Sequence, residues 1–395
     1  EYVEKSWNYV NEKSIPQMRE LIINYDPDIM WFDTHAWLPK DMTRVIVEEA
    51  KTLKPDMIIN SRGTPGIQDY FSTNDRPEYF QRTDRQYWEA IPTTNDSYGY
   101  HAYDKSHKPV SFFVDLLVRA AGRGGNLLMN VGPMGNGEID PVDVKILARI
   151  GDWLIPNGES IYGAERTPLA VQAWGDTTVK GNKLYLQVMN WPTSGQLVVG
   201  GLKSDVKSAY FLTQDDGAGL DHERLNDLDV VLSVPEEAPD ALSTVIVLEL
   251  DGAIVADLAI LLSPSVTSNT LHVFEGELHG KGIKWGGGNV RTNFIQTWSD
   301  AQSYISWPIR ANEDSRYKLV AHYTGMRDNI GNVFTIEIAG QSFDATVEKQ
   351  GKYRAVTAGE VDIPAGGHTL VVMAKALKPG SNLVNLTDVS LIPLK

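Results

Sequence analysis

The chain has 395 residues, which is more than one ordinary hydrophobic core holds and indicates two or three domains. Its formal net charge of -15 argues against nucleic acid or an anionic membrane as a partner, because both require a basic surface. The absence of cysteine excludes disulfides and thiolate metal sites, and no apolar run reaches the roughly 18 residues of a membrane-spanning helix.

The first part of the chain alternates helical and apolar strand-like segments, which is typical of parallel βα units. The first helix is predicted from Ser14, as the N-terminal cap, to Tyr25. The following elements are predicted in chain order as strand 29–32, helix 40–53, strand 57–60, helix 110–121, strand 126–131 and helix 142–154. We expect a (β/α)8-type barrel whose N-terminal part is missing, since a whole barrel takes roughly 250 residues.

From Ala164 onward the apolar period changes to two, which indicates antiparallel strands. Strands predicted within 184–188, 196–199, 209–212 and 244–250 form a first β-sandwich, and those within 304–308, 317–323, 333–338 and 370–373 form a second. Residues 251–268 are expected to be a linker. The predicted domains are therefore 1–163, 164–250 and 251–395, with the linker opening the third.

Two acidic residues follow predicted strands of the first domain. Asp33 ends the apolar run that begins at Ile29, and Glu78 lies in the sequence Arg76-Pro-Glu-Tyr79 one strand unit later. Barrel enzymes carry their catalytic groups at the carboxyl ends of strands, and a pair of carboxylates is what cleavage of a glycosidic bond requires. An Asp before a helix is also a common N-cap, and a Glu after Pro is also a common solvated loop residue, so these readings stay open.

Several motifs of the first domain resemble, in the same order, those of the α-L-fucosidases of glycoside hydrolase family 29. The segment Pro27-Asp-Ile-Met-Trp-Phe-Asp33 resembles the one that carries the family's nucleophile, and Ile59-Asn-Ser-Arg62 resembles its arginine strand. Further on are Tyr87-Trp-Glu89, Ser97-Tyr-Gly-Tyr100 and the run Gly124-Gly-Asn-Leu-Leu-Met-Asn-Val-Gly-Pro133, which is the most specific of these matches. The likeness covers residues 14 to about 165.

The resemblance implies a role for each matching residue. Asp33 would be the nucleophile and Glu78 the general acid and base, with Glu89 as the rival for that second role. Arg62, Trp31, Trp88 and Glu89 would bind the sugar. Thr34 stands where the family usually has Gly, and His35, His101 and His107 do not match the histidines with which the family holds fucose.

The third domain is loosely similar to the sandwich carbohydrate-binding modules of glycosidases. Trp285 and Trp298 are candidates for stacking on a sugar, with burial in the core as the alternative. A structural calcium ion is conceivable there, although the sequence has no dedicated ligand motif for it.

The sequence and the resemblance together predict a retaining exo-α-L-fucosidase that acts on fucosylated oligosaccharides or glycoconjugates, with α-1,3 or α-1,4 linkages suggested by the segment Trp88–Asp96. We expect no cofactor, no nucleic acid partner and no membrane insertion. We expect a secreted, periplasmic or cell-surface location. The alternatives are a glycan-binding protein without catalysis and another barrel glycosidase with shifted carboxylates.

Overall fold

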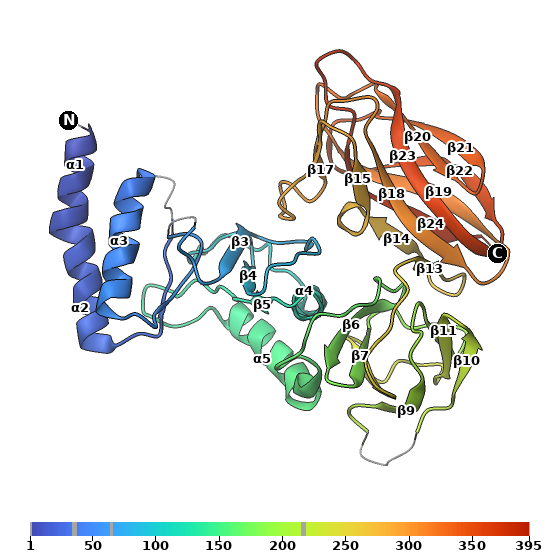
Figure 1. The fold of residues 1–395 in the computed structure, drawn as a ribbon, viewed down its shortest axis with the longest axis horizontal. Helices are drawn as coiled ribbons and strands as arrows, with labels where there is room; N and C mark the ends of the chain where they lie inside the picture. Colours follow the sequence, from blue (N-terminus) through green and yellow to red (C-terminus); the bar gives the residue numbers. More distant parts are fainter. Residues whose placement is uncertain (1, 34–37, 64–65, 215–218, 395) are drawn as a thin grey trace. The chain divides into compact units, whose positions relative to one another are not determined.

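The computed structural model describes residues 2–33, 38–63, 66–214 and 219–394 (Figure 1). The chain divides into two compact units, which we describe separately. Unit 1 comprises Glu1–Asn74, Asp84–Ile91 and Gly125–Leu128, and unit 2 comprises Asp75–Thr83, Pro92–Gly124 and Met129–Lys395.

The helices of unit 1 pack around a small apolar core. Helix α1 (Tyr2–Tyr9), the π-helical turn η1 (Val10–Ser14) and α2 (Ile15–Tyr25) form one continuous helical stretch, and α3 (Lys40–Leu53) matches its predicted range (Figure 1). The predicted cap at Ser14 is wrong, because this residue has helical dihedral angles (φ -63°, ψ -51°) and the helix runs through it. The core between these helices and the strands contains Val10, Met18, Ile22, Met42, Ile46, Val47, Ala50, Met57 and Ile59.

The strands of this part are short and follow one another in chain order. Strand β1 (Ile29–Met30) pairs in parallel with β2 (Ile58–Ile59), and a parallel bridge joins Asn60 to Tyr70. Next come β3 (Phe71–Asp75), β4 (Trp88–Ile91) and β5 (Asn126–Leu127), which form a sheet in that order with β4 parallel to β5. Strands β1 and β2 pair in parallel and flank α3 in the chain, as predicted for βα units. Strands β1, β2 and β5 are shorter than predicted, and β3 and β4 were not predicted.

Two helices of unit 2 cover the following sandwich. They are α4 (Val110–Gly122) and α5 (Pro141–Asn157), which leads into the 3-10 turn η3 (Gly158–Ser160). The side chain of Asp140 caps α5 by accepting a hydrogen bond from the backbone N–H of Val142 at 2.8 Å. Val114, Val118 and Trp153 pack against Tyr185 and Val247 of the sandwich, so the helices and the sandwich share one core.

The middle sandwich consists of two antiparallel sheets, as the sequence predicts. One sheet has the order β6-β7-β12-β9 and the other β10-β11-β8. The strands are β6 (Gly175–Lys180), β7 (Lys183–Val188), β8 (Gln196–Val199), β9 (Val206–Phe211), β10 (His222–Asn226), β11 (Asp229–Ser233) and β12 (Thr244–Leu250). Their alternating side chains form a buried core that includes Leu184, Leu186, Leu232, Ile246 and Leu248.

A second and larger sandwich follows, which we call the C-terminal module (residues 260–393). One sheet has the order β13-β18-β23-β20-β21 with β15 beside β18, the other has the order β14-β24-β19-β22, and β16 and β17 form a hairpin. The strands are β13 (Ile260–Leu262), β14 (Asn269–His272), β15 (Glu277–His279), β16 (Ile283–Trp285), β17 (Ile295–Trp298), β18 (Tyr304–Ala311), β19 (Ser315–Gly325), β20 (Val333–Ile338), β21 (Gln341–Thr346), β22 (Gly351–Ile363), β23 (Gly366–Ala376) and β24 (Asn385–Pro393). The short 3-10 helix η4 (Val273–Glu275) follows β14.

One boundary of this module differs from the prediction. Residues 251–268 were expected to be a linker, but Ile260, Leu261 and Leu262 are buried and pair in parallel with β18. The module therefore begins inside the predicted linker, because a short apolar run among Ser, Thr and Pro is enough to fill an edge position of the sheet. Among the described residues, we find no helix with the length and apolar character needed to cross a membrane.

Candidate active site

Asp33 lies just beyond the carboxyl end of β1 and presents an exposed carboxylate. Its side chain is 53% exposed and its Oδ1 is 3.0 Å from Nη1 of Arg62, which follows the neighbouring strand β2. The backbone next to it is fixed, because Asn60 pairs its side-chain amide with the N–H of Phe32 at 3.0 Å and with its C=O at 2.9 Å. The carboxylate is therefore held by a cation and open to solvent rather than buried under packed side chains.

Arg62 is itself held in place from two further sides. Its Nη2 donates to the backbone carbonyl of Thr73 at 2.8 Å, and its guanidinium lies 5.1 Å from the ring centroid of Trp31. Only 15% of the Arg62 side chain is exposed. A guanidinium fixed in this way presents a directed positive charge to Asp33.

Trp31 connects this pair to Glu89. Its indole Nε1 donates to Glu89 Oε1 at 2.6 Å, and Glu89 lies buried on β4. Burial, followed by the negative charge of nearby Glu89, raises the pKa of Tyr70. Unit 1 thus brings together four of the predicted residues, Asp33, Arg62, Trp31 and Glu89, and adds Tyr70, which was not among the predicted site residues.

Trp88 has a packing role in this structure. Its side chain is 2% exposed, and a Cβ atom added at Gly125 would lie 2.2 Å from its ring. The predicted contact of Trp88 with sugar is therefore wrong. Its ring packs in the interior, in the space that Gly125 leaves open by having no side chain. This close approach explains why Gly stands at position 125.

Glu78 belongs to unit 2, on the loop that follows β3. Both of its carboxylate oxygens accept hydrogen bonds: Oε1 from the phenol of Tyr353 at 2.9 Å and Oε2 from the side-chain amide of Asn293 at 3.2 Å. Both donors belong to the C-terminal module. They lie 275 and 215 residues from Glu78 in the chain, so no local sequence signal pointed to them.

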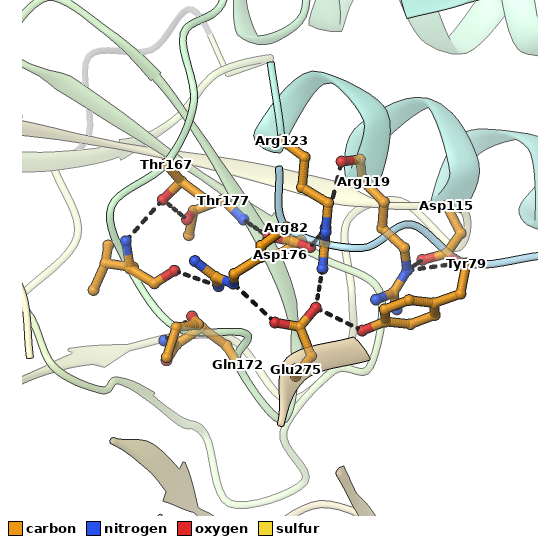
Figure 2. A network of polar contacts seen from close by, with 12 residues as sticks. Tyr79, Arg82, Asp115, Arg119, Arg123, Thr167, Gln172, Asp176, Thr177 and Glu275 are labelled. Carbon is orange, nitrogen blue, oxygen red and sulfur yellow. Dashed lines mark hydrogen bonds and ion pairs between the residues drawn. The ribbon is translucent and has the colours of Figure 1, made fainter. Parts of the chain in front are cut away.

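The loop that carries Glu78 is anchored by a buried polar network (Figure 2). Arg82 pairs with Glu275 at 2.9 Å and donates to the carbonyl of Leu169 at 2.8 Å, while the phenol of Tyr79 donates to Glu275 at 3.2 Å. Arg123, at the end of α4, binds both Glu275 and Asp176, the latter at 2.7 Å. Within unit 2, this network of ion pairs therefore connects the Glu78 loop and the end of α4 with the middle sandwich and the C-terminal module.

The histidines of the first part lie outside these clusters or outside the described residues. Thr34 and His35 belong to the residues that the structure does not describe. His101 lies in edge contact with Tyr103, and Nε2 of His107 is 3.3 Å from Asp143.

The two predicted stacking residues of the C-terminal module differ. Trp298 is 0% exposed and its indole donates to the carbonyl of Ser303 at 3.2 Å, so its predicted contact with sugar is wrong and it is a core residue. Trp285 is 37% exposed and donates to the carbonyl of Val273 at 3.0 Å, which leaves part of its ring accessible. Within the described ranges, no group of three or more His, Asp or Glu side chains gathers in a way that would hold a metal ion.

The comparisons with known proteins agree on the family of the first part. The family model described as Alpha-L-fucosidase matches residues 1–159, and a Domain of unknown function (DUF5077) matches residues 284–392. Residues 1–159 thus match the α-L-fucosidase family, as the motifs predicted.

Among sequence relatives, the plasma alpha-L-fucosidase of Homo sapiens is 25% identical over 240 residues, which is 57% of this chain and 51% of that protein. The alpha-L-fucosidase of Dictyostelium discoideum is 27% identical and covers 48% of this chain and 44% of its own length. The chain thus spans about half the length of these relatives.

Among solved structures, the alpha-L-fucosidase from Vibrio sp. strain EJY3 has a TM-score of 0.75 at 24% identity and covers 98% of this chain and 70% of its own, a likeness that concerns the fold. Alpha-L-fucosidase isoenzyme 1 from Paenibacillus thiaminolyticus has a TM-score of 0.54 at 30% identity and covers 62% of both chains. An alpha-L-fucosidase from Bacteroides thetaiotaomicron, solved as a trapped covalent intermediate, has a TM-score of 0.54 at 26% identity and covers 60% of both chains.

Proposed function

We propose that the protein is a retaining exo-α-L-fucosidase that releases α-linked L-fucose from oligosaccharides or glycoconjugates. The observation that carries the proposal is the open carboxylate of Asp33, 3.0 Å from Arg62, within a segment that the fucosidase family model matches. The trapped covalent intermediate of the Bacteroides thetaiotaomicron relative supports a double displacement, since such an intermediate belongs to the retaining route.

In this proposal the two acids act in turn. A carboxylate oxygen of Asp33 attacks the anomeric carbon while the glycosidic bond breaks and the leaving oxygen takes the proton of Glu78. Water then attacks the fucosyl ester, giving its proton to Glu78, and Asp33 leaves as the carboxylate. Retention requires the two carboxyl groups to be about 5 to 5.5 Å apart around the bound sugar.

The fold that we propose for residues 1–163 is the C-terminal portion of a (β/α)8-type barrel. The parallel strands in chain order support this, because consecutive βα units build the barrel wall. Two sandwiches would follow, and the expected domain boundaries 164–250 and 251–395 remain part of the proposal, with β13 moved from the linker to the module.

The test is hydrolysis of an aryl α-L-fucoside by the whole protein and by Asp33→Ala. We expect the substitution to abolish turnover by several orders of magnitude, and azide to restore it with a product of inverted configuration, because azide replaces the missing nucleophile. Asp28→Ala is the matched control, since that side chain is 95% exposed and pairs at 3.7 Å with Lys54. An Asp33→Ala enzyme with full activity contradicts the nucleophile assignment.

The finer features of the function belong to the same proposal. The segment Trp88–Asp96 favours α-1,3 and α-1,4 linkages, which a comparison of branched and linear fucosylated oligosaccharides tests.

We also propose a secreted, periplasmic or cell-surface location and catalysis without a cofactor, so dialysis against EDTA should leave turnover unchanged. A change in melting temperature on that dialysis would instead support the structural calcium ion.

A glycan-binding protein without catalysis is the competing function. The half-exposed ring of Trp285 is the observation in its favour, because such a ring can stack on a sugar face. Binding of fucosylated glycans without any release of fucose by the whole protein would favour this alternative. Turnover that survives in Asp33→Ala and is lost on substitution of other acids would favour another glycosidase with shifted carboxylates.

A further inference from the structure

The loop that carries Glu78 lies against the C-terminal module like an added strand. The backbone N–H groups of Glu78 and Tyr79 both donate to the carbonyl of Gly288, at 2.8 and 3.1 Å, and that of Val290 donates to the carbonyl of Arg76 at 3.1 Å. An antiparallel bridge joins Pro77 to Asn289. The main chain of the loop is therefore held by residues that come more than two hundred positions later.

The glycine run after Trp285 makes this approach possible. Gly288 has φ +77°, and a Cβ atom there would lie 2.3 Å from the carbonyl oxygen of Tyr79. The side chain of Gln81 reaches back to the carbonyl of Gly286 at 2.8 Å. The glycines of the sequence Trp285-Gly-Gly-Gly288 thus allow the Glu78 loop to pack closely against this turn.

Tyr353 is the most unusual member of this contact. It is a non-glycine residue with φ +55° on β22, and its side chain is 72% exposed, yet its phenol donates to Glu78. A positive φ is rare for a bulky residue such as tyrosine. It persists where the surrounding structure enforces it, and such residues cluster at functional sites. Partial desolvation of the phenol, followed by the hydrogen bond to Glu78 and the charges of Glu78 and Asp96, raises the pKa of Tyr353 to about 12.

Asn293 donates to the other oxygen of Glu78, Oε2, at 3.2 Å. The next residue of the loop, Tyr79, stacks on the ring of His272 in the module, with centroids 3.9 Å apart and an interplanar angle of 5°. With one donor on each oxygen, the orientation of the Glu78 carboxylate is restrained, and each oxygen keeps acceptor capacity for a further partner.

We propose that the C-terminal module, which contains the domain of unknown function, is a working part of the catalytic site: Tyr353 and Asn293 are positioning residues that orient the general acid and base Glu78. The inference rests on the proposed function of Glu78. It gives the module a catalytic task in place of, or in addition to, the binding of glycans. Neither residue needs to touch the substrate for this task.

The test compares Tyr353→Phe with the wild-type protein in kcat, KM and the pH profile of kcat/KM on an α-L-fucoside with a poor leaving group, whose cleavage needs the proton of Glu78. Loss of one hydrogen bond to a charged group should lower kcat by about tenfold with little change in KM. The alkaline limb of the profile should move to higher pH, because the ionised carboxylate loses a donor that stabilised it. Tyr162→Phe is the matched control, since Tyr162 is also exposed and lies in the same unit.

A double-mutant cycle with Glu78→Gln decides whether Tyr353 acts through Glu78. We expect Tyr353→Phe to have no further effect on kcat in the Glu78→Gln background. Wild-type kcat and an unchanged pH profile in Tyr353→Phe would overturn the inference while leaving the proposed function intact, as would an effect that adds in full to that of Glu78→Gln. Absence of fucosidase activity in the wild-type protein would overturn the proposed function and this inference together.

Discussion

The carboxylate of Asp33 lies 3.0 Å from the guanidinium of Arg62. The two residues follow the carboxyl ends of two neighbouring parallel strands, β1 and β2. The pair is asymmetric, because the Asp33 side chain is 53% exposed and that of Arg62 only 15%. Arg62 is thus the fixed partner and Asp33 the accessible one, which suits the nucleophile role that we propose for Asp33.

Replacing Arg62 by Lys should reduce activity even though the positive charge is kept. Lysine cannot bind Asp33 and the carbonyl of Thr73 at once from a planar group, nor lie flat on Trp31. We expect kcat/KM on an aryl α-L-fucoside to fall by roughly ten- to hundredfold, the equivalent of one charge-assisted hydrogen bond. Arg44→Lys, an exposed residue paired loosely with Glu48 at 3.8 Å, is the control, and equal activities of the two variants would contradict the role of Arg62.

The two candidate acids should respond differently to replacement by the neutral amide. Glu78→Gln should lower kcat/KM by about 10²- to 10⁴-fold on a substrate with a poor leaving group and far less on an activated aryl fucoside, because only the former needs a proton. Glu89→Gln should stay within a few fold of the wild-type value, since the amide oxygen can still accept from Trp31. The reverse pattern, with leaving-group dependence in Glu89→Gln, would transfer the acid role to Glu89.

The sequence predicted the elements whose pattern is local. Helix α3 and strands β12 and β20 have the predicted bounds, because amphipathic period and β-branched content decide them within a few residues. The pairing of Asp33 with Arg62 was also within reach, since both residues follow strands that lie side by side. Strand β13 was missed because its burial depends on β18, which comes much later in the chain.

The rest of the candidate site depends on contacts that no local pattern encodes. Tyr353 reaches Glu78 across 275 residues, and the three glycines after Trp285 gain their meaning only from the backbone of Tyr79 that lies against them. Trp298 and Trp285 are the same residue type in similar sequence surroundings, yet one is buried and the other partly exposed. Composition cannot separate these two cases, because a tryptophan is equally suited to a core and to a binding face.

Gly125→Ala should damage unit 1 although it adds a single methyl group. The new Cβ would lie 2.2 Å from the ring of Trp88, whose neighbour Glu89 holds Trp31. Overpacking of this kind destabilises by about 1–3 kcal/mol or more, and displacement of Trp88 should lower fucosidase activity as well. In Gly135→Ala the methyl group would enter open space, so an unchanged melting temperature is expected there. Equal melting temperatures of the two variants would show that Trp88 moves aside freely.

His272 should make the protein less stable as the pH falls from about 6.5 to 4. Burial lowers the pKa of His272 from 6.5 to about 4, with a smaller opposite effect of Asp388, so the unfolded chain takes up a proton before the folded protein does. The contribution of His272 to the free energy of unfolding is complete above pH 6.5, the pKa of His272 in the unfolded chain. It is lost as the pH falls towards 4, its pKa in the folded protein, and the total loss is roughly 3 kcal/mol. In His272→Asn, which can still accept from the N–H of Phe274, the drop in melting temperature between pH 7 and 4.5 should shrink. His101→Asn, at an exposed site, should retain it, and an unaltered drop in His272→Asn would contradict the neutral buried ring.

Glu275 should add a second loss of stability at lower pH. Burial by itself would raise the pKa of Glu275, but Arg123 and Arg82 outweigh it and hold the value at about 2, below the ordinary 4.5. Its contribution to stability is therefore present above about pH 4.5 and lost as the pH falls towards 2.

Glu275→Gln leaves two arginines without their shared carboxylate, and breaking such a buried pair should destabilise the protein by about 3–5 kcal/mol at pH 7. Because protonation removes the same charge from the wild-type protein, the difference in melting temperature between wild type and Glu275→Gln should narrow from pH 5 to pH 2. Glu277→Gln, whose parent side chain is 78% exposed, should match the wild type throughout, and a constant gap for Glu275→Gln would show that the network of Figure 2 does not depend on this charge.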